Sequence, residues 1–145
     1  MDRPGSAQPE VAPPTVRRRG WVWLALGLVA LGAYLPRVCR TLCLFGDSAE
    51  LATAAAVWGV PHAPGYPLLT LVGHLFTRLP WGEVAFRTHL TSAAFHAATV
   101  AVVGATLHRL TGSILGAVSG AALLGLARSF FLGSLYYEVF PLNDL

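Results

Sequence analysis

The sequence predicts an all-α integral membrane protein, and three observations carry that prediction. Hydrophobic residues make up 54% of the 145 residues and charged residues 12%, which is about half the charged share of an ordinary soluble domain. The mean hydropathy is +0.58, so the chain has too few polar groups to cover its own surface in water. Apolar runs also alternate with short segments that are rich in proline and glycine.

The first expected span covers residues 20–36 and follows a polar, proline-rich tail. Residues 1–16 show no apolar periodicity and are expected to be disordered. Three arginines at residues 17–19 precede the span, and basic residues mark the cytoplasmic side, so the N-terminus is expected in the cytoplasm. A secretory signal peptide has the same basic start, but no clear small-residue cleavage site follows, which favours an uncleaved span.

Residues 37–83 contain too many prolines and glycines for one continuous span and are expected to form a loop on the outer face. Two short helices fit inside this loop, at residues 48–58 and 68–79. Each is too short to cross a hydrocarbon core of about 30 Å at a rise of about 1.5 Å per residue. We therefore expect both helices to lie along the membrane surface, with residues 59–67 as the turn between them.

Two further spans are expected at residues 84–108 and 113–135. Basic residues end the second span at the inner face, and the third span returns to the outer face. The residues after 135 then emerge outside. Counting the spans therefore places the acidic segments around Asp47 and Glu138 on the same side of the membrane.

The charge, cysteine and histidine patterns argue against two functional classes. Most of the ten arginines behind the net charge of +3 are scattered, so no nucleic-acid partner is expected. The two cysteines form no CxxC motif, and the histidines lack metal-ligand spacing, so neither a metal site nor a bound cofactor is expected. Four histidines (His74, His89, His96 and His108) are interpreted as interface or helix-packing residues.

The strongest candidate for chemistry is the segment from Gly46 to Glu50. Asp47 and Glu50 stand three residues apart, so at the start of a helix their carboxylates approach each other. One carboxylate could act as a general base while the other positions it. The alternative is structural, because an acidic N-cap followed three residues later by glutamate resembles a capping box. The residues alone leave both interpretations open.

A second candidate is the turn that carries His62 and Tyr66 among three prolines and a glycine. These neighbours fix the backbone of the turn rather than fill a core. His62 could donate a hydrogen bond to an acceptor or to a phosphate. The alternative is a histidine that simply lies at the membrane interface.

Two arginines lie within or beside the later spans, Arg87 at the outer end of the second and Arg128 in the outer half of the third. A charge inside a span costs about 2.5 kcal/mol or more, so it usually faces a cavity or a partner. The two arginines could clamp a lipid phosphate. Alternatively, Arg128 could snorkel outward or pair with Glu138.

Together these motifs resemble a GT-C-type family of multi-span membrane glycosyltransferases that includes transmembrane protein 260 and many bacterial relatives. The strings that carry the resemblance are GDSAELATAAAVWGVPHAPGYPLLTLVGHLF, AFRTHLTSAAFHA and YYEVFPLND, within residues 40–145. The sequence departs from the family pattern at Ala49, where glycine is usual, and at Ala63, where proline is usual. Neither change touches a carboxylate.

The resemblance implies the N-terminal transmembrane helices of a GT-C fold and transfer of a sugar from a polyprenyl- or dolichyl-phosphate donor. The implied catalytic residues are Asp47, as the base, and Glu50. The implied substrate-binding residues are His62, Tyr66, Arg87, Arg128, Glu138 and Asn143. Mannose as the sugar follows from the animal relative.

The implied partners are membrane lipid, the lipid-linked donor and a protein or glycan acceptor, in a bacterial inner membrane or an endoplasmic-reticulum membrane. Family members have many more spans, so this chain is expected to be an N-terminal fragment that is inactive alone. Two other classes stay open. One is a non-catalytic membrane protein or transporter fragment, and the other is a GT-C enzyme that acts on a lipid or a cell-wall glycan.

Overall fold

The computed structural model describes residues 20–145, so the predicted tail at 1–16 and the arginines at 17–19 lie outside the described residues. All regular elements in the described part are helices, which confirms the predicted all-α membrane class. Their bounds are α1 Gly20–Tyr34, η2 Leu35–Arg37, α2 Ser48–Val57, α3 Pro67–Thr77, α4 Val84–Thr111, α5 Ile114–Leu126, α6 Arg128–Gly133 and α7 Phe140–Asp144.

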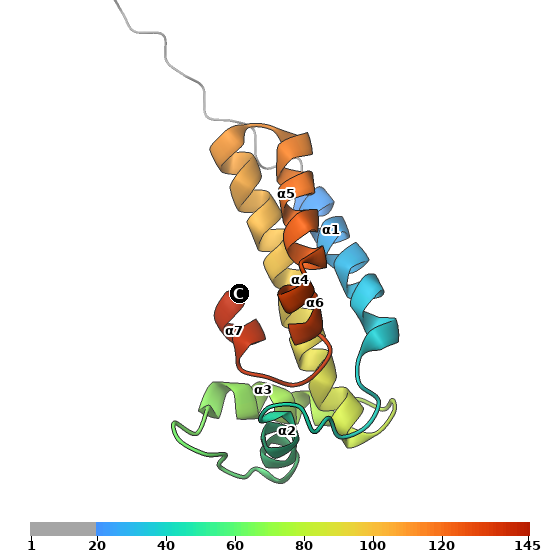
Figure 1. Cartoon of the computed structure of the whole chain (residues 1–145), viewed down its shortest axis with the longest axis vertical. Helices are drawn as coiled ribbons and strands as arrows, with labels where there is room; N and C mark the ends of the chain where they lie inside the picture. Colours follow the sequence, from blue (N-terminus) through green and yellow to red (C-terminus); the bar gives the residue numbers. More distant parts are fainter. Residues whose placement is uncertain (1–19) are drawn as a thin grey trace, which may run out of the picture.

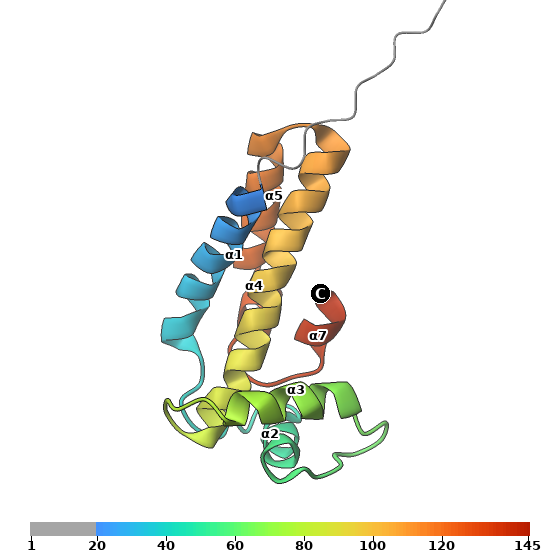
Figure 2. The same ribbon diagram turned by 180° about the vertical axis from the view of Figure 1, so that it is seen from behind.

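The helices form two layers. Helices α1, α4, α5 and α6 form an upright bundle, while α2 and α3 lie across one end of it (Figure 1). The view from behind in Figure 2 shows the same arrangement, with α7 beside α4. The bundle therefore presents α2 and α3, with their connecting turn, at a single end.

Two described helical segments are long and apolar enough to cross a membrane, Gly20–Arg37 and Val84–Thr111. They coincide with the expected spans at 20–36 and 84–108, and α4 ends slightly later than predicted. Gly112 ends α4 with a φ of 68°, a left-handed conformation that glycine adopts without strain. The two spans pack closely, since a Cβ at Gly27 would lie 2.9 Å from the carbonyl oxygen of Ala97.

The expected span at 113–135 is not one continuous helix. The segment divides into α5 and α6 because Ala127 is extended, with a ψ of 132°. The Tyr34 hydroxyl donates to the Gly125 carbonyl at 3.0 Å. An unbroken helix would use that carbonyl to accept the N–H of Ser129. The contact from α1 therefore stabilises the break, and α5 alone, at 13 residues, is too short for a span.

Helices α2 and α3 lie within two residues of their predicted bounds. The outer face of α3 exposes three leucines at positions 68, 71 and 75, a pattern suited to a helix lying in a membrane surface. Its inner face carries Gly73, where a Cβ would clash with the Tyr137 ring and lie 3.0 Å from the Ala55 side chain. The absence of a side chain at Gly73 thus lets α3 approach both α2 and the C-terminal segment.

The C-terminal segment was predicted only to emerge from the membrane, but residues 134–145 form a strap along α4 that ends in α7. Tyr137 is fully buried in the core cluster of Leu51, Ala55 and Leu69. Its hydroxyl donates to the Leu69 carbonyl. The strap is therefore fastened to the layer formed by α2 and α3.

Candidate functional site

Asp47, Glu50 and His62 form a triad at the exposed start of α2. Asp47 is the N-cap of this helix and Glu50 lies in its first turn. Glu50 accepts the His62 backbone N–H at 2.7 Å and the His62 ring Nδ1–H at 3.0 Å. The other ring nitrogen, Nε2, lies 3.7 Å from Asp47 Oδ2. The imidazole ring therefore stands between the two carboxylates.

The capping-box interpretation of Asp47 and Glu50 is wrong. The Asp47 side chain makes no capping hydrogen bond to α2, and Glu50 turns to His62 rather than back to the N-cap. The bond from the His62 backbone N–H, followed by that from its ring, holds the pKa of Glu50 below its usual value. Glu50 is thus a charged group whose position orients the His62 ring.

The turn between α2 and α3 presents His62 and Tyr66 together. The Gly65 N–H donates to the His62 carbonyl at 2.9 Å, and Gly65 has a φ of 88°, which favours glycine. Tyr66 begins α3 as its N-cap. Its ring packs edge-on against His62, with ring centroids 5.6 Å apart. One turn therefore brings both predicted binding residues beside the carboxylates.

Glu138 reaches the triad from the strap and is only 6% exposed. A Cβ at Gly46 would lie 2.7 Å from Glu138 Oε1, so the carboxylate closely approaches the backbone before Asp47. Burial raises the pKa of Glu138, and the charge of Asp47 acts in the same direction, while the Asp47 backbone N–H acts against it. The two acidic segments, which span counting places on the same side of the membrane, lie close together.

His89 links the two segments that carry these acids. The Tyr137 backbone N–H donates to His89 Nδ1 at 3.0 Å, so the ring must carry its proton on Nε2. That nitrogen donates to the Thr41 carbonyl at 3.1 Å. Because His89 is fully buried, a single side chain of α4 fixes the strap before Glu138 and the loop before Asp47.

His89 belongs to a polar stripe on α4 that also includes Ser92 and His96. The Glu138 N–H donates to Ser92 Oγ at 3.3 Å, and His96 Nε2 lies 3.0 Å from Asp144 Oδ2 in α7. Positions spaced by three and four residues share one helix face. The sequence alone suggests interface or helix-packing roles for the histidines and does not reveal this one. Polar residues on one face of a membrane-spanning helix were the signal that could have revealed it.

The two predicted arginines make no hydrogen bond or ion pair with the triad in the described part of the chain. Arg87 donates to the Gly82 carbonyl at 2.7 and 3.0 Å and to the Thr77 carbonyl at 2.8 Å. Arg128 is exposed at the start of α6. The suggested pairing of Arg128 with Glu138 is not among the ion pairs of residues 20–145.

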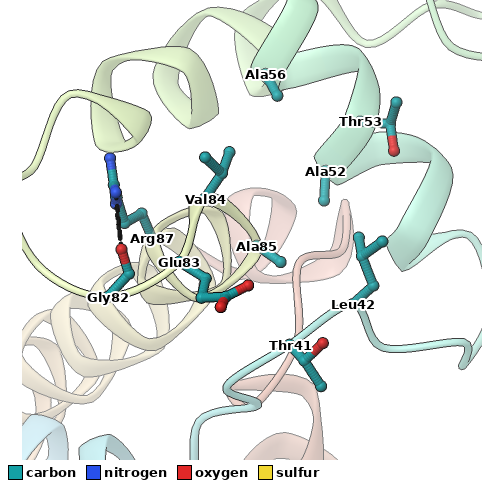
Figure 3. A pocket seen from close by; sticks show the side chains of 10 residues that line it. All are labelled: Thr41, Leu42, Ala52, Thr53, Ala56, Gly82, Glu83, Val84, Ala85 and Arg87. Atoms are coloured by element: carbon teal, nitrogen blue, oxygen red, sulfur yellow. Dashed lines mark hydrogen bonds between the residues drawn. The ribbon is translucent and has the colours of Figure 1, made fainter.

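Other predicted binding residues line two pockets. Arg87 and Glu83 line an open pocket of about 600 Å³ between α2 and the start of α4. Figure 3 shows Arg87 at one side of it, bonded to Gly82. Tyr66 and Asn143 line a smaller pocket of about 210 Å³ between α3 and the strap. Apart from Arg128, the predicted residues therefore lie either in the triad with Glu138 or along these two pockets.

The triad also has the composition of a metal-binding cluster. One ligand atom from each of Asp47, Glu50 and His62 lies within 4.8 Å of the other two. The sequence alone predicts no metal site, because its histidines and cysteines have no regular spacing. The turn that returns His62 to Glu50 across twelve residues leaves no such spacing.

Comparison with known proteins gives one consistent family. A family model described as the protein O-mannosyl-transferase TMEM260 N-terminal domain matches residues 47–145. The mouse protein O-mannosyl-transferase TMEM260 is 43% identical over 101 residues, which are 69% of this chain and 14% of the mouse protein. The Dictyostelium discoideum protein of that name is 47% identical over 34 residues, 23% of this chain and 4% of its own length. No solved structure matches the chain significantly.

The chain therefore spans only a small part of the length of the relatives that it matches. The match nevertheless runs from Asp47 through the triad, α2, α3, α4 and the strap. These are the elements that build the candidate site. On this evidence the chain belongs to the TMEM260 family, in the part that corresponds to the family's N-terminal domain.

Proposed function

We propose that this chain forms part of a glycosyltransferase of the GT-C type. This glycosyltransferase moves mannose from a polyprenyl- or dolichyl-phosphate donor to a hydroxyl group of a protein or glycan acceptor. The observation that carries the proposal is the triad, which lies with Glu138 at one end of a bundle with two apolar spans. The printed names of the relatives support the reaction class.

Asp47 is the general base of the proposed reaction. Its carboxylate is exposed and is not used to cap α2, so it is free to meet an acceptor hydroxyl. The acceptor oxygen attacks the anomeric carbon, the bond from that carbon to the phosphate oxygen breaks, and Asp47 takes the hydroxyl proton. Glu50 holds His62 in place by two hydrogen bonds, and His62 Nε2 faces Asp47.

Arg87 is the proposed partner of the departing phosphate. A guanidinium has five N–H donors, and three of those of Arg87 bond to carbonyls that fix its orientation at the edge of the larger pocket. The remaining two donors match the geometry of a phosphate. Arg128, exposed on α6, is the alternative partner.

The proposed topology places α2, α3 and the triad on the outer face of a bacterial inner membrane, or on the lumenal face of the endoplasmic reticulum. The arginines at 17–19 favour a cytoplasmic N-terminus. Helix α1 then carries the chain across the membrane to the layer formed by α2 and α3. The leucine face of α3 supports a position in the membrane surface.

The test uses membranes that contain the full gene product. One sample of these membranes is supplied with polyprenyl-phosphate mannose. A second sample is first depleted of the lipid-linked donor and is then supplied with a nucleotide-activated mannose. We expect transfer only from the lipid-linked donor, and acceptor profiling then separates protein from lipid or glycan acceptors. Turnover of neither donor would support a non-catalytic membrane protein, and turnover of the nucleotide sugar alone would contradict the proposed donor.

A further inference from the structure

The loop between η2 and α2 contains the two cysteines of the chain, Cys39 and Cys43. Residues 38–47 are not helical, and the backbone bends at residues 40 and 41. In a helix, side chains four residues apart run side by side and rarely reach the geometry that a disulfide requires. A bent loop has no such restriction, so this spacing allows a disulfide here.

The two thiols lie close together in this loop. Burial raises the pKa of the Cys43 thiol most, and the Phe45 backbone N–H lowers it. The Cys39 thiol raises the same pKa through its charge and through a side-chain hydrogen bond. Two side chains that share such a contact need only a rotation about their Cα–Cβ bonds to bring the sulfur atoms within bonding range. The fold therefore places the cysteines as a pair.

Neighbouring segments hold the loop in this bent form. The Cys39 backbone N–H donates to the Leu135 carbonyl at 2.9 Å, and the Cys39 thiol donates to the Thr41 carbonyl at 3.2 Å. The Thr41 carbonyl also accepts the Nε2–H of His89 at 3.1 Å. Because the backbone is anchored at these two points, the pair belongs to a defined loop conformation.

The surroundings of Cys43 suit a structural cysteine better than a reactive one. A catalytic or redox-sensing cysteine usually has a lowered pKa, beside a cation or at a helix N-terminus. Burial shifts the pKa of Cys43 upward instead, and the charge of Glu138 acts in the same direction. Both thiols are also half-buried rather than exposed. A nucleophilic role is therefore disfavoured, and a covalent link between the two thiols is the remaining chemistry.

The proposed topology gives this pair an oxidising environment. The loop leaves α1 at the end of the bundle that carries α2 and α3 (Figure 1), and the proposed function places that end on the outer or lumenal face. Disulfides form and persist in the bacterial periplasm and the endoplasmic-reticulum lumen but are rare in the cytosol. We propose that Cys39 and Cys43 form a structural disulfide that closes the loop before Asp47, in a compartment that rests on the proposed function.

Formation of the disulfide is a two-electron oxidation. The S–S bond forms as the two thiols lose two protons and two electrons. The disulfide of a thiol oxidoreductase accepts both and is released as a dithiol. The closed ring contains Thr41, whose carbonyl bonds His89. The disulfide therefore adds a covalent restraint to the loop that His89 fixes and that ends at Asp47.

The first test asks whether the reduced chain closes this disulfide in detergent. The purified chain is treated with oxidised glutathione, its remaining thiols are blocked with N-ethylmaleimide, and its intact mass is measured. We expect the mass to fall by two hydrogen atoms, with no maleimide or glutathione added, and a non-reducing gel to show a monomer. Maleimide or glutathione on both cysteines, or a disulfide-linked dimer, would overturn the proposal.

The matched controls for this test are Cys39→Ser and Cys43→Ser. Each variant keeps one thiol and the hydrogen-bonding capacity of the replaced side chain. The remaining thiol should carry glutathione or maleimide, and circular dichroism verifies that both variants are folded. A variant whose single thiol resists both reagents would show that burial, and not a disulfide, protects the wild-type cysteines, and would overturn the proposal.

The second test asks whether the disulfide exists in cells. Cells that express the full gene product are blocked with N-ethylmaleimide before lysis, and the protein is digested without a reductant. Trypsin cleaves after Arg40, so Cys39 and Cys43 fall in separate peptides, residues 38–40 and 41–78. We expect these two peptides to remain linked until a reductant is added. Separate peptides that both carry maleimide, or a link from either to another cysteine, would overturn the proposal.

The disulfide and the proposed function fail in different ways. Linked peptides in a full gene product that transfers no sugar support the disulfide and contradict the function. Sugar transfer by a full gene product whose Cys39 and Cys43 both carry maleimide supports the function and overturns the disulfide.

Discussion

Replacing His89 by leucine tests whether one buried side chain holds the candidate site together. His89 accepts the Tyr137 backbone N–H at 3.0 Å and donates to the Thr41 carbonyl at 3.1 Å. Leucine has a similar size but can make neither bond. The change therefore removes the hydrogen-bonded link between the strap before Glu138 and the loop before Asp47, and it creates no large cavity.

The expected magnitude follows from the two groups that lose their partner. Each buried polar group left unpaired costs about 1–3 kcal/mol, so His89→Leu should lower the free energy of unfolding by about 2–6 kcal/mol. The matched control is His108→Leu on the same helix. His108 Nδ1 has no hydrogen-bond partner in the described residues. The His108 ring packs against Trp23, with ring centroids 5.5 Å apart. The control should therefore cost only about 0.5–1.5 kcal/mol.

The assay is SDS-induced unfolding from mixed micelles, followed by far-ultraviolet circular dichroism. Hydrogen exchange measured alongside should show faster exchange of the Tyr137 amide in His89→Leu, because its acceptor is gone. A His89→Leu variant that is no less stable than His108→Leu, with Tyr137 still protected, would refute the role assigned to His89.

Two further changes test the packing by the same unfolding assay. Gly73→Ala should cost about 1–3 kcal/mol through overpacking, because the new Cβ would lie 2.6 Å from Tyr137 Cζ. Gly32→Ala in α1 is its control, since nothing lies within 4 Å of that Cβ, and equal effects of the two changes would contradict the close contact. Tyr34→Phe removes the bond to the Gly125 carbonyl and should cost about 0.5–1.5 kcal/mol. An unchanged stability would show that this bond does not support the break at Ala127.

The sequence predicts the elements that depend on local pattern. Helix α4 is recognised from its apolar run, and the ends of α2 and α3 from the prolines and glycines around them. Span counting also predicts that Asp47 and Glu138 lie on one side, because it needs only the order of the segments. These features depend on neighbours in the chain, so a single sequence carries them.

The sequence does not predict features that depend on distant contacts. The break at Ala127 is stabilised by a hydroxyl 91 residues away from the carbonyl that it bonds. The choice between a capping box and a triad depends on where the turn carries His62. The polar stripe on α4 becomes meaningful only once the strap lies along it. In each case the deciding partner is remote in sequence.

Asp47→Asn in the full gene product tests whether Asp47 is the base of the proposed sugar transfer. Asparagine keeps the size and position of the side chain but cannot take the acceptor proton. We expect transfer from polyprenyl-phosphate mannose to fall by about 10²–10⁴-fold. Full transfer by a folded Asp47→Asn variant would show that Asp47 is not the base.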